Sequence, residues 1–190
     1  MQEPALTTIE TARLQLRPMR RDDFDALLQI FTDPKVMAAF GGELFTPAQM
    51  HGWLGRNLEH QAQFGYGLFS VIRKADGRLI GDCGLERMTV DGHASAELGY
   101  DFRSDAWNHG FATEAARAVR DHAFTELRLP QLISLIRVGN LASRRVAEKV
   151  GMQLMAEPER YGIRYWQFAL EHSKQKKYNS CVSRNEPSAC

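Results

Sequence analysis

Residues 107–116 read Trp-Asn-His-Gly-Phe-Ala-Thr-Glu-Ala-Ala and pass directly from a tight turn into a helix-forming run. Gly110 can adopt backbone angles that other residues avoid, and it lets a ligand approach the backbone closely. The amides at a helix N-terminus are unpaired and carry the positive end of the helix dipole, so they suit a phosphate group. We interpret this stretch as a diphosphate cradle. Taken alone, it fits equally well a helix that simply begins after a glycine turn.

The composition is ordinary for a globular protein and argues against several classes of partner. The chain has 190 residues, of which 44% are hydrophobic and 25% charged, so we expect one domain with a core of reasonable size. Its 24 Lys and Arg nearly balance its 23 Asp and Glu, which argues against a dedicated nucleic-acid binder. No apolar run approaches the length of a membrane span, and the N-terminal segment lacks a signal-peptide pattern. We therefore expect a cytoplasmic protein with no nucleic-acid or membrane partner.

The three cysteines, Cys83, Cys181 and Cys190, predict neither a metal site nor a disulfide framework. Their spacing fits no zinc pattern, and their number is odd. Cys83 lies in a predicted strand, where a cysteine is more often part of the core than a nucleophile.

The N-terminal part of the chain predicts one strand followed by two helices. Leucines alternate with polar residues over 14–18, which indicates a strand ending at a proline. Apolar residues at helical spacing predict a helix over 24–31, ended by Asp33-Pro34. A second helix begins at Thr46-Pro47 with a capping box. The apolar link 36–45 between the helices fits either plain packing or a mobile wall of a substrate cleft.

The remainder alternates strands with helices. Hairpin signals at Asp76-Gly77 and Asp91-Gly92 separate three successive antiparallel strands. We predict strands over 66–73, 79–88, 94–102, 132–138, 152–156 and 164–170, and helices over 112–127 and 142–150. Gly151 closes the last helix, at a position that needs a left-handed conformation. We place one domain at 8–171 and expect the polar, lysine-rich segment 172–190 to be a disordered tail.

This order of elements, combined with the cradle, resembles the GCN5-related N-acetyltransferase (GNAT) superfamily, whose central helix starts with Arg/Gln-x-x-Gly-x-Gly/Ala. Trp107-Asn-His-Gly-Phe-Ala112 fills that register, with Trp107 where Arg or Gln is usual. With tryptophan at this position, the motif resembles that of the branch that acetylates the N-termini of ribosomal proteins at alanine or serine. Three further segments match that branch in order: Glu-Leu-Gly-Tyr at 97–100, Asn-Leu-Ala-Ser at 140–143 and Ala-Glu-Lys-Val-Gly-Met at 147–152.

The resemblance implies an α/β (α+β) GNAT fold, with a mixed central sheet of about seven strands splayed between strands 4 and 5 and about four helices. It also implies that acetyl-CoA lies in the gap of the splay, where the pantetheine arm pairs with a strand backbone. The cofactor-binding residues implied by register are Tyr100, Asp101, Phe102, Trp107, Asn108, His109, Gly110, Phe111, Ala112, Thr113, Asn140 and Ser143.

The same resemblance implies direct acetyl transfer without an acyl-enzyme and without a metal. Ser143 would protonate the departing thiolate, although Asn140 and Ser143 also fit a helix cap. Glu97, on the strand just before the splay, is the candidate general base; a solvated or salt-bridged carboxylate fits it equally well. Glu114 is less suited to that role, because the helix dipole already explains an acid in a first turn. The basic residues Arg144, Arg145 and Lys149 fit either a contact to the 3′-phosphate or a solvated face.

We therefore expect an acetyl-CoA-dependent N-acetyltransferase, a monomer or a homodimer, that acts on a primary amine of a protein N-terminus or a small molecule. An acidic cleft would suit a polycationic acceptor, but the sequence does not place carboxylates such as Glu86 in space. The alternative is a non-catalytic acyl-CoA-binding sensor, which needs the cradle but no acceptor site. A nucleoside triphosphatase is excluded, because no Gly-Lys-Ser/Thr follows a glycine loop.

Overall fold

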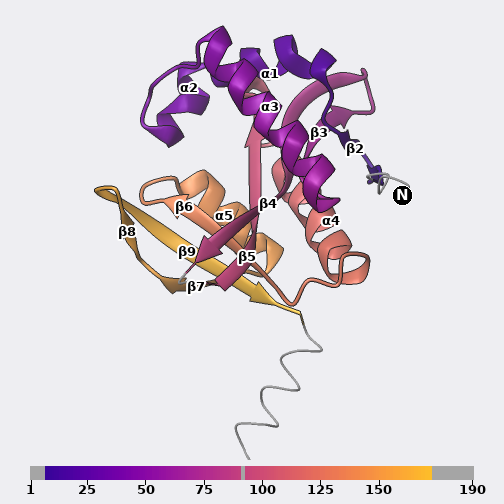
Figure 1. The fold of residues 1–190 in the computed structure, drawn as a ribbon. Helices are drawn as coiled ribbons and strands as arrows, with labels where there is room; N and C mark the ends of the chain where they lie inside the picture. The colour runs from indigo at the N-terminus through magenta and orange to yellow at the C-terminus, as the bar shows by residue number, and fades with distance from the viewer. Residues whose placement is uncertain (1–6, 91–92, 173–190) are drawn as a thin grey trace, which may run out of the picture.

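A computed structural model describes residues 7–90 and 93–172 (Figure 1). A mixed sheet runs through the molecule in the order β1-β2-β3-β4-β5-β6-β9-β7, with β8 paired to β9. Its strands are β1 (Ile9–Glu10), β2 (Leu14–Pro18), β3 (Leu68–Arg73), β4 (Arg78–Val90), β5 (His93–Phe102), β6 (Gln131–Arg137), β7 (Gln153–Ala156), β8 (Glu159–Arg160) and β9 (Ile163–Glu171). The predicted turn at Asp91-Gly92 and the predicted tail from residue 173 onward lie outside the described residues.

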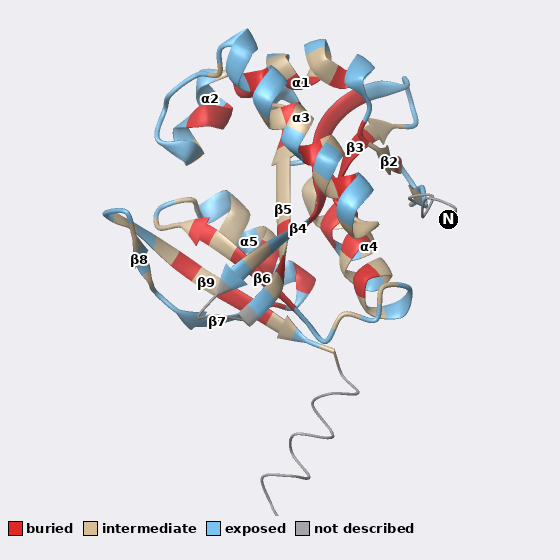
Figure 2. Ribbon diagram, viewed as in Figure 1, coloured by how far each residue is buried: buried red, intermediate tan, exposed pale blue. Residues whose placement is uncertain are grey.

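The helices form two groups on opposite faces of the sheet. They are α1 (Phe24–Phe31), α2 (Pro34–Met37), α3 (Pro47–Phe64), α4 (Phe111–Thr125) and α5 (Leu141–Val150), with short 3₁₀ turns at Arg21–Asp23, Ala38–Phe40 and Ser104–Ala106. One buried cluster joins α1, α2 and α3 to the sheet, and another joins α4 and α5 to it. In Figure 2 the red segments of the ribbon mark buried residues along α4 and the central strands. The small residues of α4, such as Ala115 and Ala116, are fully buried, so this helix lies close to the sheet.

The sheet opens between β5 and β6. These two strands run parallel and pair only at Ala96↔Leu132 and Glu97↔Ile133. β5 remains paired with β4 as far as Phe102, and β6 remains paired with β9 as far as Arg137. Beyond Glu97 each strand therefore has one edge with no strand partner in the described chain, where an extended ligand can add its own hydrogen bonds.

The predicted fold class and its splay are confirmed, with β5 and β6 as the fourth and fifth strands of the sequence prediction. The structure adds β1 and β8, which have two residues each, and the four-residue α2. Elements of two to four residues are too short to show a hydrophobic period in the sequence. Their geometry is imposed by pairing and packing with the rest of the fold. The helix over 24–31 ends before Asp33-Pro34, as predicted. Pro34 then begins α2, and Asp33 caps it by accepting a hydrogen bond from the Lys35 amide at 2.9 Å.

Other local predictions are confirmed. Thr46 and Gln49 form the capping box of α3, and Gly151 closes α5 at a φ of +96°. Cys83 is buried in the core with a free thiol. Across the described residues, no helix combines the length and the apolar character that crossing a membrane requires.

Candidate active site

The cradle forms as a left-handed turn that leads directly into α4. Gly110 is the N-cap of α4 with a φ of +81°, and Asn108 also has a positive φ, of 62°. Gly110 has no side chain to bond the first amides of α4, and within the described chain no side-chain cap replaces it. The N–H groups of the first helical turn therefore point outward at the positive end of the helix dipole, which is the arrangement that binds an anion.

A cluster of polar side chains fixes the start of α4 to the N-terminal part of the chain. Glu114 accepts hydrogen bonds from the Thr11 hydroxyl at 2.6 Å and from the backbone amide and Nε of Arg13 at 2.9 and 2.7 Å. Arg13 also donates to the carbonyl oxygen of His109 at 2.9 Å and lies 4.5 Å from the centre of the Phe111 ring. We call these contacts of Thr11 and Arg13 with Glu114 and His109 the clamp; it holds the turn against the segment that leads into β2.

Glu114 is therefore fixed as a structural carboxylate. Burial acts to raise its pKa, but the hydrogen bonds from Thr11 and Arg13 hold the pKa below its usual value. A carboxylate that already accepts several hydrogen bonds is a poor proton acceptor. This agrees with the interpretation that Glu114 stabilises the helix start and is not the general base.

Two ring side chains of the cradle, Trp107 and His109, contact nearby backbone carbonyl oxygens. Trp107 donates its indole N–H to the carbonyl oxygen of Phe102 at 2.8 Å. His109 lies with Nδ1 at 2.7 Å from the carbonyl oxygen of Trp107 and stacks on Phe111. These contacts tie the cradle to the end of β5, so the free edge of the strand leads directly to the helix start.

All of the predicted cofactor-binding residues meet around one cavity of about 580 Å³ between the end of β5, the start of α4 and α5. They are Tyr100, Asp101, Phe102, Trp107, Asn108, His109, Gly110, Phe111, Ala112, Thr113, Asn140 and Ser143. Of the three basic residues considered from the sequence, Arg145 and Lys149 line this cavity. Arg144 instead pairs with Glu148 at 2.9 Å and lies 4.8 Å from the Trp166 ring centre.

Asn140 and Ser143 form the cap of α5 and also face the cavity. Asn140 Oδ1 accepts a hydrogen bond from the Ser143 amide at 3.1 Å, so the capping interpretation is correct. The Tyr100 hydroxyl donates to the carbonyl oxygen of Ser143 at 2.7 Å, across the gap between β5 and α5. Burial raises the pKa of Tyr100, so this hydroxyl keeps its proton. The bond fixes the width of the gap next to Ser143.

Glu97 occupies the apex of the splay. Its Oε1 accepts a hydrogen bond from the Leu135 amide at 3.0 Å, just beyond the last β5–β6 pair. Burial raises the pKa of Glu97 to about 7; the bond from Leu135 opposes this rise and the nearby Glu86 adds to it. The side chain is partly buried and hydrogen-bonded, and a pKa near 7 suits proton transfer near neutral pH.

Two further acids lie on the same face of the hairpin as Glu97, four positions along it, and sequence analysis gave their side chains no role. Asp82 of β4 and Asp101 of β5 are direct cross-strand partners. Burial, together with repulsion from Asp101 and Glu86, raises the pKa of Asp82 well above its usual value. Burial also raises the pKa of Asp101 to about 7. From the sequence only the backbone of Asp101 was given a role. The sequence pattern that could have identified the two aspartates is the mirrored spacing Asp-x-Gly-x-Glu at 82–86 and Glu-x-Gly-x-Asp at 97–101.

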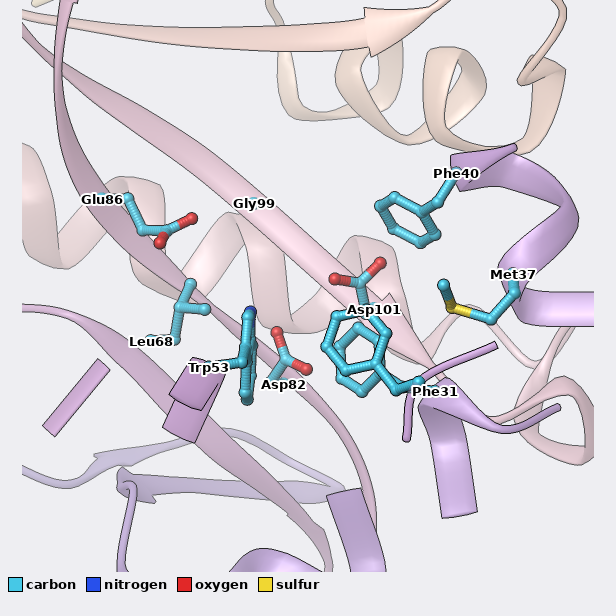
Figure 3. Close-up of a pocket in the computed structure, with 10 residues that line it drawn as sticks. Phe31, Met37, Phe40, Trp53, Leu68, Asp82, Glu86, Gly99 and Asp101 are labelled. Carbon is cyan, nitrogen blue, oxygen red and sulfur yellow. The ribbon is translucent and has the colours of Figure 1, made fainter. Parts of the chain in front are cut away.

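These acids line a second cavity, of about 220 Å³, under α1 and α3 (Figure 3). Glu86 and Gly99 also line it, and the rest of its wall is apolar: Phe31, Met37, Phe40, Phe45, Trp53 and Leu68. A third cavity, of about 230 Å³, contains Glu97 and shares Glu86, Gly99 and Asp101 with the second. Residues of the link 36–45 line all three cavities, so the link is a wall of the site.

Comparison with known proteins identifies the family. The model of the acetyltransferase (GNAT) domain matches residues 13–153. This chain belongs to the GNAT acetyltransferases. One relative, the uncharacterized protein YkkB of Bacillus subtilis (strain 168), is 34% identical, and the match covers 92% of this chain and 99% of YkkB. The uncharacterized N-acetyltransferase p20 of Bacillus licheniformis is 32% identical over 78% of this chain and 83% of its own.

Solved structures agree with this assignment. An acetyltransferase from Agrobacterium tumefaciens (strain C58) superposes with a TM-score of 0.76 at 30% identity, covering 87% of this chain and 95% of the other. RimL, a ribosomal L7/L12 alpha-N-protein acetyltransferase in complex with coenzyme A, shares the fold with a TM-score of 0.73 at 16% identity, over 87% and 98% of the two chains. The chain is therefore an N-acetyltransferase whose fold is shared with the ribosomal-protein branch.

The geometry of this GNAT enzyme divides the site into two parts. The large cavity has free backbone amides, an open strand edge and the side chains of Arg145 and Lys149, which suit an elongated anion. The smaller cavities have carboxyl groups and aromatic walls, which suit an amine. Gly99 and Asp101 belong to the strand that separates the two parts, so groups bound on either side meet along β5.

Proposed function

We propose that this acetyltransferase transfers an acetyl group directly from acetyl-CoA to a primary amine bound under α1 and α3. The observation that carries the proposal is the position of the acid-lined cavities, which lie against β5 just where its free edge faces the large cavity. Acetyl-CoA supplies the activated acetyl group when it is bound. The open edge of β5 and the free amides of α4 fit a pantetheine arm and a diphosphate.

The residues of the chain then have separate tasks. The backbone of residues 100–102 holds the pantetheine arm, and the amides of residues 107–113 hold the diphosphate. Asn140 orients the arm, and Ser143, fixed by its bond from Tyr100, gives a proton to the departing sulfur. Glu97 takes the proton of the incoming ammonium group, because a carboxyl with a pKa of about 7 is about half ionised at neutral pH and is more basic than an ordinary carboxylate.

Transfer in this arrangement depends mainly on position. The wall formed by residues 36–45 and the Tyr100–Ser143 bond keep the two parts of the site at a fixed separation, and such positioning contributes a large part of the rate of a two-substrate reaction. A backbone N–H on the free edge of β5 can polarise the acetyl carbonyl. A nucleophilic side chain is unnecessary in this scheme.

The test is a panel of acceptors that contains small primary amines and peptides with free N-termini, with release of the coenzyme A thiol as the measured signal. We expect thiol release that depends on the amine and an acetylated product seen by mass spectrometry. Calorimetry with acetyl-CoA alone is the companion measurement. Binding without transfer to any amine would favour the acyl-CoA sensor, and absence of binding would reject the assignment of the large cavity.

A further inference from the structure

The four acids of the β4–β5 hairpin form two facing pairs on one side of the sheet. Glu86 pairs with Glu97, and Asp82 pairs with Asp101. Residues that alternate along a strand share a face, and directly opposed residues lie side by side, so all four side chains point the same way. The two pairs are four positions apart, which is about 13 Å along an extended strand.

The cavity floor between the two pairs is open on the β5 side, whereas on β4 the position of Gly84 is covered by the backbone of Gly67 and Leu68. Gly99 lies midway between Glu97 and Asp101, and among the residues that the structure describes a Cβ at Gly99 would meet only Leu68, at 3.9 Å. In Figure 3, Glu86 lies on one side of Gly99 and the two aspartates on the other. A narrow chain can therefore extend from one acid pair to the other over the backbone of Gly99.

Asp82 has no counter-ion within the described chain. Its side chain is fully buried, and both carboxyl oxygens lack a hydrogen-bond partner there. Its neighbour on β3, Ser70, donates its hydroxyl to Asp23 at 2.7 Å instead. Arg17, the next residue along this row, also binds Asp23, at 2.8 and 2.5 Å. A buried carboxyl without a partner is costly, so this position needs a proton or a cation from outside.

The walls around Asp82 suit an organic cation. Phe31 stacks with Phe45 at 5.0 Å between ring centres and contacts Trp53 at 4.9 Å, and all three rings line the cavity. The faces of aromatic rings attract ammonium groups, and the apolar walls match a hydrocarbon chain. Magnesium, in contrast, retains several waters and prefers a shell of oxygens.

We propose that the acceptor of this acetyltransferase is a linear diamine or oligoamine, whose distal ammonium group binds at Asp82 and Asp101 while the amine to be acetylated lies at Glu97. The proposal rests on the proposed function and adds the class of acceptor to it. The distal ammonium replaces the proton that the Asp82–Asp101 pair holds when empty. The aromatic rings and Leu68 enclose the methylene chain.

The protons of the transfer balance in this arrangement. The reacting ammonium group gives one proton to Glu97, and the amine lone pair then forms the N–C bond as the C–S bond breaks. The nitrogen loses a second proton, and the sulfur gains one from Ser143. Each turnover therefore yields one amide and one thiol and releases one net proton to solvent, while Glu97 and Ser143 return to their starting states.

The test compares three ligands with six carbon atoms each: hexamethylenediamine, hexylamine and aminocaproate. Calorimetry without acetyl-CoA measures their binding, and thiol release measures their acetylation. We expect the diamine to bind at least about tenfold more tightly than hexylamine, and aminocaproate to bind most weakly, because each lost or reversed charge interaction in a dry site costs a factor of this order. Diamine binding at neutral pH should also release a proton, which buffers of different ionisation enthalpy detect.

The decisive variant is Asp82→Asn, which keeps the shape of the side chain and removes its charge. We expect it to abolish the preference for the diamine over hexylamine and to leave the dissociation constant of acetyl-CoA unchanged. Asp121→Asn, an exposed residue of α4, is the matched control and should leave the preference intact. Glu86→Gln is a second probe that changes the other acid pair, and a thermal melt of each variant checks its folding.

The outcomes separate the two proposals. Equal binding of diamine and hexylamine, or an unchanged preference in Asp82→Asn, would overturn the cation site while leaving acetyl transfer intact. Diamine binding that depends on Asp82, without acetylation of any amine, would keep the cation site and reject the proposed function. Magnesium chloride is added as a competitor; if it displaces the diamine at equal concentration, the site holds a metal ion and the proposed acceptor class is wrong.

Discussion

Replacing Glu97 by Gln is expected to stabilise the protein while removing most of its activity. Burial raises the pKa of this carboxyl from its ordinary value of 4.5 to about 7. Because the folded state binds the proton more tightly than the unfolded state, ionisation opposes folding. The destabilisation is absent below pH 4.5, grows as the pH rises toward 7 and is constant above it. Its size above pH 7 is about 3 kcal/mol, at about 1.4 kcal/mol for each unit of pKa.

Gln keeps an oxygen acceptor for the Leu135 amide and carries no charge, so it avoids this cost. For a chain of this size, about 3 kcal/mol corresponds to roughly 6–12 °C in melting temperature. We expect Glu97→Gln to melt higher than the unsubstituted protein at pH 8, with little difference at pH 4.5. Loss of a general base should lower kcat/KM by about 10²- to 10⁴-fold and remove the rise of kcat/KM with pH around 7.

Thermal melts at several pH values and a pH–rate profile with an amine acceptor measure both effects. Glu157→Gln is the control, because Glu157 forms an exposed ion pair with Arg164 at 3.1 Å, and such pairs contribute at most about 1 kcal/mol. A difference in melting temperature that is the same at pH 4.5 and pH 8 would refute the raised pKa. An unchanged pH–rate profile would refute the role of Glu97 as base.

Two further predictions concern the cradle and its clamp. Gly110→Ala puts a side chain at a φ of +81°, which costs about 1–2 kcal/mol, and should weaken acetyl-CoA binding about tenfold by calorimetry. Gly151→Ala, at a φ of +96° and outside the large cavity, should lose similar stability with no change in binding; equal loss of binding in both would contradict the cradle. Glu114→Gln disrupts the clamp to Thr11 and Arg13 and should cost about 1–3 kcal/mol in unfolding experiments while leaving the pH–rate profile unchanged. An altered profile would mean that Glu114 exchanges protons with the substrate.

The parts of the site that sequence reasoning located are those formed by neighbouring residues. The cradle is one continuous stretch, because a glycine turn and the helix that follows it place their amides together without help from distant segments. The cap made by Asn140 and Ser143 is local in the same way. Four such motifs in one order were enough to indicate the family and therefore the splayed sheet.

The parts that sequence reasoning missed depend on residues far apart in the chain. The clamp joins Arg13 to Glu114 across 101 positions, and no local pattern connects them. Asp82 is an ordinary polar residue of a predicted strand until the hairpin register places it against Asp101. The link 36–45 fitted either packing or a cleft wall, and only its position beside the cavities distinguishes these.

The sequence by itself therefore determined the fold class, the helix start that suits a diphosphate and the residues around it, since short-range backbone preferences and residue order encode these features. Tertiary structure alone decided the chemical character of the acids. The pKa of Glu97 and the lack of a partner for Asp82 among the described residues follow from burial and from neighbours on other strands, and both depend on how distant segments pack. The physical reason is that backbone conformation is largely a local property, whereas the energy of a charge depends on everything that surrounds it.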